Sequence, residues 1–368
     1  MTTHHNPQAR HWRTAPLADS PIDFHRSLPG YQPTALTDVP ALAAELGVGQ
    51  VLVKDESQRL GLPAFKILGA SYAIARALSD RSGLDHVAPL PELRDQIAGQ
   101  ELSLIAATDG NHGRAVAHVA GLLGLPATIY VPGGLSTASL AGIRSEGAEL
   151  VELERPYDDV VAHAAEQSGG TALLIQDTSW EGYVQVPQWI VDGYATLLQE
   201  VDGQLAEAGV DRLDLVVTPA GVGSLLQAVV HHYRSTEHAP ALVAVEPDTA
   251  ASVTAALEAG QVVPVPTGNT VMTGLNCGTV SHIAWPTLRD GLDASVPVSD
   301  DAALAAVATL GELGVDSGPC GAATLAALRA VTGDDELRTQ LGLTADAVAV
   351  LLSTEGRAAN PKERHERG

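Results

Sequence analysis

Cysteine and apolar runs of membrane-spanning length are what this sequence most clearly lacks. Cys277 and Cys320 are the only cysteines in 368 residues. Two thiols in a chain of this length indicate a reducing compartment rather than a disulfide framework, and their spacing is not that of a zinc-ligand set. No run approaches the roughly 18 apolar residues that span a membrane. A disulfide scaffold and a membrane-spanning protein are therefore both excluded.

Positive charge is also scarce. The formal net charge is −23 and the sequence pI is about 4.8. Such a surface repels nucleic acid and anionic membranes, so neither is expected as a partner. The first residues, MTTHHNPQARHWRTAPLADSP, contain no apolar core of a secretory signal. Together with the cysteine usage, this predicts a cytoplasmic protein.

Short apolar segments alternate with Ala/Leu-rich segments along most of the chain, and hydrophobic residues make up 45% of it. The apolar segments, expected as strands, are 51–56, 102–108, 126–132, 149–154, 172–178, 213–221, 242–247 and 347–354. The helical candidates between them are 65–80, 110–124, 136–147, 222–235 and 300–314. Strand, helix and strand in succession is typical of mostly parallel sheets flanked by helices, so the sequence predicts an α/β fold.

One of only three lysines stands in the otherwise apolar or small stretch LPAFKILGASYA, residues 62–73. A lysine there can bury its stem and keep its ammonium in water. Alternatively, Lys66 carries a covalent cofactor, because a desolvated lysine with a lowered pKa is the residue that forms a Schiff base with an aldehyde.

A glycine-rich turn, PAGVGSLLQAVV, follows the expected strand 213–221 and opens the next helix. Gly221, Val222, Gly223 and Ser224 would present backbone N–H groups at a helix start, where a phosphate group fits. No Gly-Lys-Ser/Thr follows, so this is not a nucleotide P-loop. A plain tight turn made possible by glycine is the alternative.

Polar side chains gather at three other strand ends. Asp109, Asn111 and His112 lie in TDGNHGRAVA, where either of the first two could simply cap a helix. His112 alone is typical of a structural histidine. Asp177 ends another apolar segment. Ser353, Thr354 and Glu355 end the last one. For Asp177 and for these three residues, ordinary turn chemistry is the alternative.

The sequence lacks the motifs of other reaction classes. There is no Gly-x-Ser-x-Gly nucleophile elbow and no His-Glu-x-x-His or clustered Cys/His set, so no metal is expected. A lysine in an apolar stretch, a phosphate cradle and two aspartates at strand ends together indicate pyridoxal phosphate as cofactor.

The combined motifs resemble those of the fold-type II pyridoxal-phosphate enzymes, the tryptophan synthase β superfamily, and within it the diaminopropionate ammonia-lyases. The similarity runs from RSLPGYQPTAL (26–36) to STEG (353–356), nearly the whole chain. The motifs, in order, are VKDESQRLGLPAFKILGASYA, TDGNHGRAVA, IQDTSWEGY, PAGVGSL, VEPDTA, TGLNCG and STEG.

This resemblance implies a role for each matched position. Lys66 corresponds to the Schiff-base lysine, which also removes the Cα proton of an L-substrate. Asn111 would bond the phenolic oxygen of the cofactor ring. The four residues of the glycine turn correspond to the phosphate cradle. Ser353 or Thr354 would face the ring nitrogen.

Asp109 and Asp177 correspond to the two carboxylates that mark the ammonia-lyases, and most dehydratases of the superfamily have serine where Asp109 stands. The resemblance therefore implies α,β-elimination of 2,3-diaminopropionate, or a close β-substituted alanine, to pyruvate and ammonia through an aminoacrylate. Asp109 could act as the base for the D-isomer. The alternatives are a serine/threonine-type dehydratase, a β-replacement enzyme, and a cofactor-binding regulatory protein without turnover.

The sequence departs from the family pattern at several positions. SGESGA of the family reads DSGPCGAAT here, with Pro319 in place of a glutamate that lies near the cofactor in relatives and Cys320 in place of a serine. The family's paired cysteines are reduced to Cys277, with Ser252 at the partner position. Pro63 stiffens the approach to Lys66. The ring environment and the choice of substrate are the properties these changes affect.

The resemblance also implies a two-domain architecture. Residues 1–85 and 185–368 are expected to form a large cofactor-binding domain, and residues 86–184 a small one, with the cofactor in the cleft between them. The proline-containing polar segment 81–100 could join the two lobes, and the charged C-terminal residues 357–368 are expected to fray. Relatives of this fold are commonly dimers, so a homodimer is expected by analogy.

Overall fold

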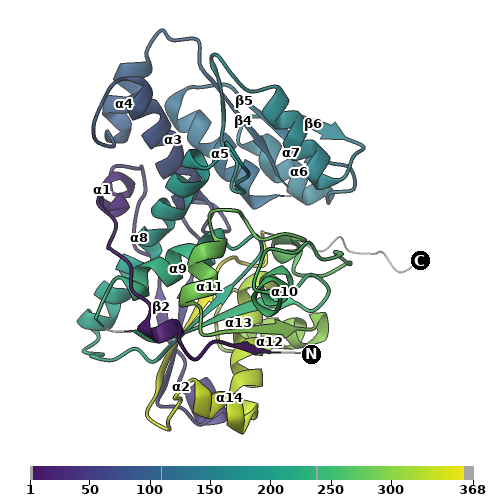
Figure 1. Ribbon diagram of the computed structural model, residues 1–368. Helices are drawn as coiled ribbons and strands as arrows, with labels where there is room; N and C mark the ends of the chain where they lie inside the picture. Colours follow the sequence, from purple (N-terminus) through teal and green to yellow (C-terminus); the bar gives the residue numbers. More distant parts are fainter. Residues whose placement is uncertain (1–2, 109, 238, 360–368) are drawn as a thin grey trace.

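Two β-sheets organise the chain in the computed structural model, which describes residues 3–108, 110–237 and 239–359. The strands of the larger sheet are β1 (His4–His5), β2 (Leu36–Asp38), β3 (Gln50–Asp55), β8 (Leu215–Pro219), β9 (Ala241–Pro247), β10 (Ala294–Val298) and β11 (Val348–Ser353). Those of the smaller sheet are β4 (Ser103–Ala107), β5 (Ala127–Pro132), β6 (Glu149–Leu153) and β7 (Ala172–Leu174). The two sheets occupy separate halves of the molecule (Figure 1).

Parallel pairing dominates both sheets. The larger has the order β1-β10-β9-β8-β11-β3-β2 and the smaller β6-β5-β4-β7. The edge strands β1 and β2 pair antiparallel, with β10 and β3 respectively. The remaining pairs of named strands in the described residues are parallel. The predicted α/β fold with mostly parallel, helix-flanked sheets is confirmed.

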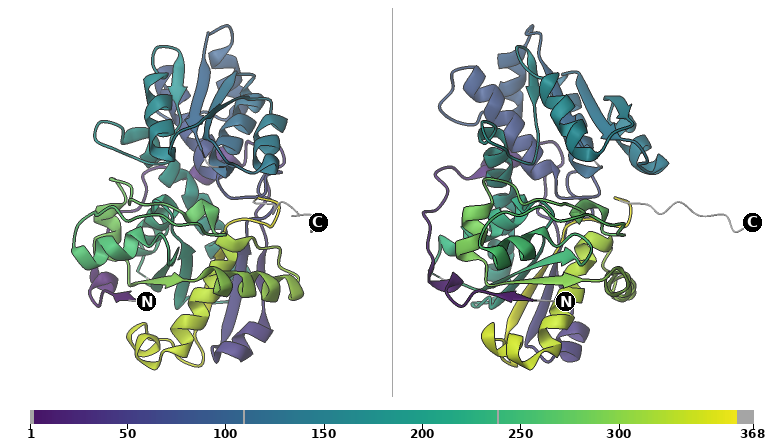
Figure 2. Two further views of the ribbon diagram at one scale, coloured as in Figure 1. Left: turned by 90° about the vertical axis from the view of Figure 1, so that its right-hand side faces the viewer. Right: turned by 45° about the vertical axis from the view of Figure 1, so that its right-hand side comes forward.

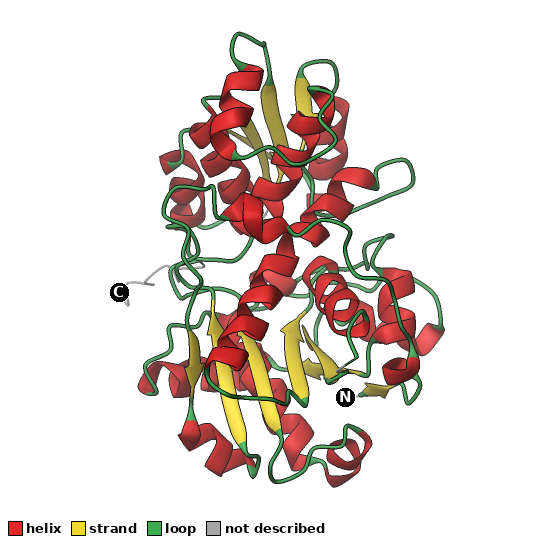
Figure 3. Ribbon diagram, turned by 90° about the vertical axis from the view of Figure 1, so that its left-hand side faces the viewer, coloured by secondary structure: helices red, strands yellow, loops and turns green. Residues whose placement is uncertain are grey.

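Helices cover both faces of each sheet (Figures 2 and 3). They are α1 (Pro21–His25), α2 (Pro40–Leu46), α3 (Ile67–Arg81), α4 (Leu90–Ile97), α5 (Asn111–Leu123), α6 (Thr137–Ser145), α7 (Tyr157–Glu166), α8 (Gln185–Glu207), α9 (Ser224–Arg234), α10 (Ser252–Ala259), α11 (Trp285–Gly291), α12 (Asp300–Glu312), α13 (Pro319–Gly333) and α14 (Asp335–Gln340). On the larger sheet, α13 packs against β8 to β11 on one face and α9 against β8 and β9 on the other. The smaller sheet lies between α5 and α7.

Local sequence explains why several helices begin where they do. Ser299 precedes α12, and its hydroxyl accepts the Ala302 N–H, which satisfies one of the amides left unbonded at a helix start. Pro319 is the first residue of α13, where its missing N–H costs nothing. The alanine-rich sequence that follows keeps α13 slim enough to pack closely on the larger sheet.

The buried core follows the two-residue period of the strands. In β11, Val350 and Leu352 belong to the apolar cluster on one face of the larger sheet, whereas Ala349 and Leu351 belong to the cluster on the other face. All four are essentially inaccessible to solvent. Burying each of the larger side chains contributes roughly 1.5–3 kcal/mol to folding. Because this central strand is covered on both faces, its sequence is a continuous apolar run.

Parallel strands place their carboxyl ends at one edge of a sheet. The turns that follow β8 and β11 therefore lie together at one edge of the larger sheet, and those that follow β4 and β7 at one edge of the smaller one. Hydrogen bonds between the two edges, described below, bring these turns together in one site.

The elements match the sequence predictions where the local signal is strong. All eight predicted strands and all five predicted helices are present, although β7 stops at Leu174, earlier than the predicted 172–178. The short edge strand β2, the strand β10 and the long helix α8 were not predicted. Segment 81–100 contains α4, and most of the C-terminal segment expected to fray lies outside the described residues. No helix in the described part of the chain is both long and apolar enough to cross a membrane.

Candidate active site

Lys66 lies immediately before α3, after a loop that pairs with the end of β11. The N–H of Phe65 donates to the carbonyl of Thr354 (3.2 Å), and the N–H of Gly356 donates to the carbonyl of Pro63 (3.0 Å). These bonds fix the backbone on which Lys66 stands. The Lys66 side chain is 22% exposed, so it is only partly desolvated.

Asp177 contacts the Lys66 ammonium directly. Lys66 Nζ donates to Asp177 Oδ2 at 2.7 Å, across 111 residues of sequence. Burial alone would raise the pKa of Asp177, but the positive charge of Lys66 and its hydrogen bond lower that pKa to about 2. The carboxylate is therefore ionised at neutral pH. The structure thus brings together two residues that the sequence predicts to be catalytic.

His112 lies behind this pair, in the first turn of α5. Its Nε2 is 2.8 Å from the carbonyl oxygen of Ile175, and its Nδ1 is 3.9 Å from Asp177 Oδ2. Burial lowers the pKa of His112 below its ordinary 6.5, so the ring is neutral at pH 7. The sequence favoured a structural role for this histidine. The structure places it beside Asp177, within the candidate site.

Asn111 reaches from the start of α5 to the end of β11. Its Nδ2 donates to Glu355 Oε2 at 3.1 Å, and Glu355 Oε1 accepts the N–H of Cys320 at 3.3 Å. Glu355 is buried, with 3% of its surface exposed. Its carboxylate therefore links the helix that follows β4 to the start of α13, the turn where Pro319 replaces the glutamate of the family pattern. Sequence reasoning missed this role, because the amide partner of Glu355 is 244 residues away.

Thr108 shapes the turn between β4 and α5. Its hydroxyl oxygen accepts the N–H of Gly110 (2.9 Å) and the N–H of Gly113 (3.1 Å). Gly110 is the N-cap residue of α5, and Asn111, the first residue of the helix, donates to Glu355. Asp109, the other predicted catalytic carboxylate, lies outside the described residues.

The turn after β8 presents backbone amides at the start of α9. In the described part of the chain, the N–H groups of Gly221, Val222, Gly223 and Ser224 donate no hydrogen bond to another loop or to a side chain. A Cβ on Gly221 would lie 3.0 Å from the carbonyl oxygen of Gly274, and Gly223 has a left-handed φ of +95°. The turn therefore requires glycine and offers several amides to one anion.

Two further contacts position this turn. The Ser224 hydroxyl donates to the backbone carbonyl of Asp177 at 2.8 Å, which ties the amide-rich turn to the Lys66 partner. The Sγ atom of Cys277 would lie 3.1 Å from a Cβ placed on Gly221. The turn thus lies between the loop after β7, which bears Asp177, and the segment around Cys277.

Ser353 and Thr354 end β11 on the same side of the molecule. The Ser353 hydroxyl donates to Ser317 Oγ at 2.7 Å. A Cβ on Gly321 would lie 2.8 Å from the Oγ atoms of both serines, so α13 can approach this strand end only with glycine at that position. Both predicted ring-facing hydroxyls are buried beside the start of α13.

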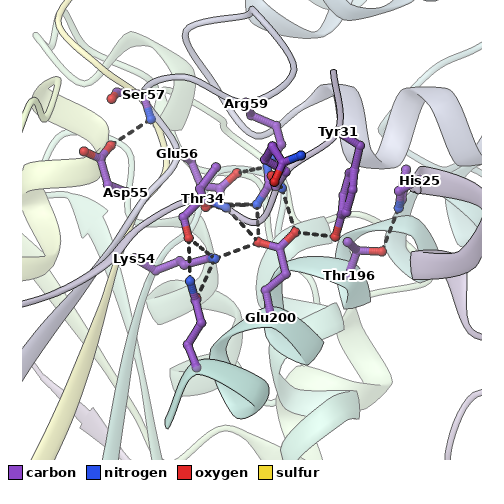
Figure 4. Close-up of polar contacts among 12 residues, drawn as sticks. His25, Tyr31, Thr34, Lys54, Asp55, Glu56, Ser57, Arg59, Thr196 and Glu200 are labelled. Atoms are coloured by element: carbon purple, nitrogen blue, oxygen red, sulfur yellow. Dashed lines mark hydrogen bonds and ion pairs between the residues drawn. The ribbon is translucent and has the colours of Figure 1, made fainter. Parts of the chain in front are cut away.

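A buried ionic network fixes the chain leading to Lys66 (Figure 4). Arg59 donates to both oxygens of Glu200, at 2.7 Å each, and to Glu56. Lys54 Nζ donates to Glu200 Oε2 at 2.7 Å. All four side chains are almost fully buried. One residue further on, Leu60 has a left-handed φ of +53°, a conformation that is strained for a residue with a side chain.

Comparisons with known proteins show the family and the fold of the chain. The family model described as "Pyridoxal-phosphate dependent enzyme" matches residues 28–354. The diaminopropionate ammonia-lyase of Salmonella typhimurium is 38% identical over 360 residues, which cover 91% of this chain and 88% of that protein. The crystal structure of diaminopropionate ammonia lyase from Escherichia coli in complex with D-serine aligns with a TM-score of 0.88 and 34% identity, over 97% of this chain and 94% of that one. Maize serine racemase, at 23% identity and a TM-score of 0.75, shares the fold.

Proposed function

The chain belongs to the pyridoxal-phosphate dependent enzyme family, and from that premise we propose that it is an ammonia-lyase acting on 2,3-diaminopropionate. The observation that carries the proposal is the 2.7 Å contact between Lys66 Nζ and Asp177 Oδ2, beside an amide-rich turn. The similarity to diaminopropionate ammonia-lyases over most of the chain supports it.

The residues present fit pyridoxal phosphate. The turn from Gly221 to Ser224 offers amides and a helix start to the phosphate group. Lys66 offers an amine to the aldehyde, and Asn111 an amide to the phenolic oxygen. Ser353 and Thr354 offer neutral hydroxyls to the ring nitrogen. When bound, the cofactor supplies an electron sink for negative charge at the substrate Cα.

The chain's own groups move the protons. In this proposal the Lys66 amine takes the Cα proton of the L-isomer, and Asp109 takes that of the D-isomer. Asp177 stays ionised, orients Lys66 and balances the positive charge of the substrate's β-ammonium group. General acid–base assistance of this kind contributes roughly 10²–10⁴-fold to the rate.

The overall reaction balances with one water molecule. Loss of the Cα proton and of the β-amino group gives one ammonia and aminoacrylate. Hydrolysis of aminoacrylate gives pyruvate and the second ammonia. A β-hydroxyl substrate such as serine would instead give one ammonia per pyruvate, which separates the two activities chemically.

We also propose the domain organisation predicted from the sequence. Residues 1–85 and 185–368 would form the large domain and residues 86–184 the small one, with the cofactor between them. The smaller sheet lies wholly within 103–174, and the Asn111–Glu355 bond joins it to the larger one, which supports this division. Hydrogen exchange with and without cofactor tests it, because protection should increase along both facing edges.

We also propose that the enzyme is cytoplasmic and that it is a homodimer. A chain with only two cysteines, Cys277 and Cys320, is compatible with a reducing compartment. The dimer is expected by analogy with fold-type II relatives. Light scattering of the purified holoenzyme and fractionation of the native cells test the two statements separately.

The experiment that tests the function compares substrates and variants. Ammonia and keto-acid release are measured with L- and D-2,3-diaminopropionate, L-serine and L-threonine, for the parent, Lys66→Ala and Asp109→Ser. The proposal predicts that diaminopropionate is preferred, that Lys66→Ala is inactive and that Asp109→Ser loses the D-isomer. Preference for serine or threonine would instead identify a dehydratase.

A further inference from the structure

His112 has one ring nitrogen with a partner and one without. The Ile175 carbonyl can only accept a hydrogen bond, so the 2.8 Å contact places the proton of the neutral ring on Nε2. Nδ1 is then an acceptor. It is buried and has no hydrogen-bond partner among the described residues. A buried acceptor without a donor is costly, which indicates that a group absent from the free protein completes it.

Nδ1 faces the reacting part of the site. Asp177 Oδ2 is 3.9 Å away, and this carboxylate is itself bonded to Lys66. Asp177 and Lys66 are the charged groups that act on His112. Two acceptors this close, one neutral and one ionised, repel each other unless a donor approaches both. No donor among the described residues forms a hydrogen bond to Nδ1, so a second donor has a place here.

We propose that His112 Nδ1 and the Asp177 carboxylate together bind the β-ammonium group of the substrate and so select an amine over a hydroxyl. This rests on the proposed function and names the residue that sets its specificity. An ammonium carries three N–H donors and can bond both acceptors at once. A hydroxyl carries one donor and leaves one buried acceptor unsatisfied. A site with buried acceptors discriminates against a ligand that cannot satisfy them.

Two substitutions separate this role from a structural one. In His112→Gln the side-chain amide can still donate to Ile175, but it offers no acceptor at the position of Nδ1. In His112→Asn the shorter amide oxygen lies near the position of Nδ1, and the bond to Ile175 is lost. The first variant removes recognition and keeps the structural bond, and the second does the reverse.

The measurement is kcat/KM for L-2,3-diaminopropionate and for L-serine, with thermal unfolding and cofactor absorbance of each holoenzyme. His112→Gln should lower the diaminopropionate-to-serine ratio about tenfold, as expected for one lost bond to a charged group, and act mainly through KM. His112→Asn should keep the ratio within about threefold while its unfolding temperature falls. If His112→Gln lowers kcat/KM equally for both substrates, so that the ratio equals that of the parent, the inference is overturned.

A second readout does not depend on turnover. Nitrogen-15 NMR of the histidine side chains, in the protein without substrate, should show His112 neutral and protonated on Nε2. A proton on Nδ1 would contradict the inference. Failure of the parent to release ammonia from diaminopropionate would instead reject the proposed function. The two failures are therefore distinguishable.

Discussion

At the scale of single residues, the two lysines in the described part of the chain differ in burial and in bonding partner. Lys54 is fully buried and bonded to Glu200, whereas Lys66 is partly exposed and bonded to Asp177. Burial alone therefore does not identify a cofactor lysine. What distinguishes Lys66 is its position among the turns that follow four parallel strands. The sequence identified this lysine from its apolar neighbours but could not show that Lys54 is the more buried of the two.

The Asn111–Glu355 bond gives a prediction at this scale. Because Glu355 has contacts besides Asn111, a double-mutant cycle is needed to isolate the pair. Asn111→Ala, Glu355→Ala and the double variant should show a coupling of about 1–2 kcal/mol in kcat/KM, with a shifted cofactor absorbance in each single variant. Additive losses would mean that the two side chains act independently.

At the scale of elements, the turn before α9 contains a residue with a left-handed φ, Gly223, at the proposed phosphate-binding site. Gly223→Ala should weaken cofactor binding about tenfold, because a left-handed φ costs a non-glycine residue about 1–2 kcal/mol and the new Cβ would lie 3.0 Å from Leu288. Gly260→Ala is the matched control, since Gly260 also has a positive φ (+67°) but ends α10 in open space. Fluorescence titration of each apoprotein with pyridoxal phosphate measures the effect. Equal weakening in both variants would assign the effect to strain alone.

Much of the element arrangement could be predicted, and the exceptions have physical reasons. Apolar strands and capped helices carry their signals locally, so β3, β8 and β11 were found. β10 contains Pro297 and follows no clear turn signal, and β2 has only three residues. The roles of His112 and Glu355 depend on partners distant in sequence, and pairings of that kind leave no trace in a single chain.

At the scale of the whole molecule, the ionic network around Glu200 ties α8 to β3 and to the loop before Lys66. Glu200→Gln should destabilise the protein by about 3–5 kcal/mol, because Lys54 and Arg59 would stay buried without a full counter-charge. Glu45→Gln, which breaks the exposed pair with Arg329, should cost less than about 1 kcal/mol. Urea unfolding at pH 7 measures both. Similar losses of unfolding free energy in the two variants would show that the buried network stabilises the protein no more than an exposed ion pair does.

The network also predicts how stability depends on pH. Burial raises the pKa of Glu200, but Arg59 and Lys54 outweigh burial and lower it from 4.5 to about 2. Its contribution is therefore complete above pH 4.5 and is lost as the pH falls towards 2. Unfolding free energies between pH 6 and about 3 should fall more steeply in the parent than in Glu200→Gln. Parallel curves would show that other carboxylates dominate acid unfolding.

The most direct test of the account is the ratio of ammonia to pyruvate released from L-2,3-diaminopropionate by the purified holoenzyme. Elimination followed by hydrolysis predicts two ammonia molecules for each pyruvate, and no release of either by Lys66→Ala. One ammonia without pyruvate, in the presence of an added nucleophile, would identify β-replacement. No ammonia at all, with the cofactor bound, would contradict the assignment of this site as an ammonia-lyase.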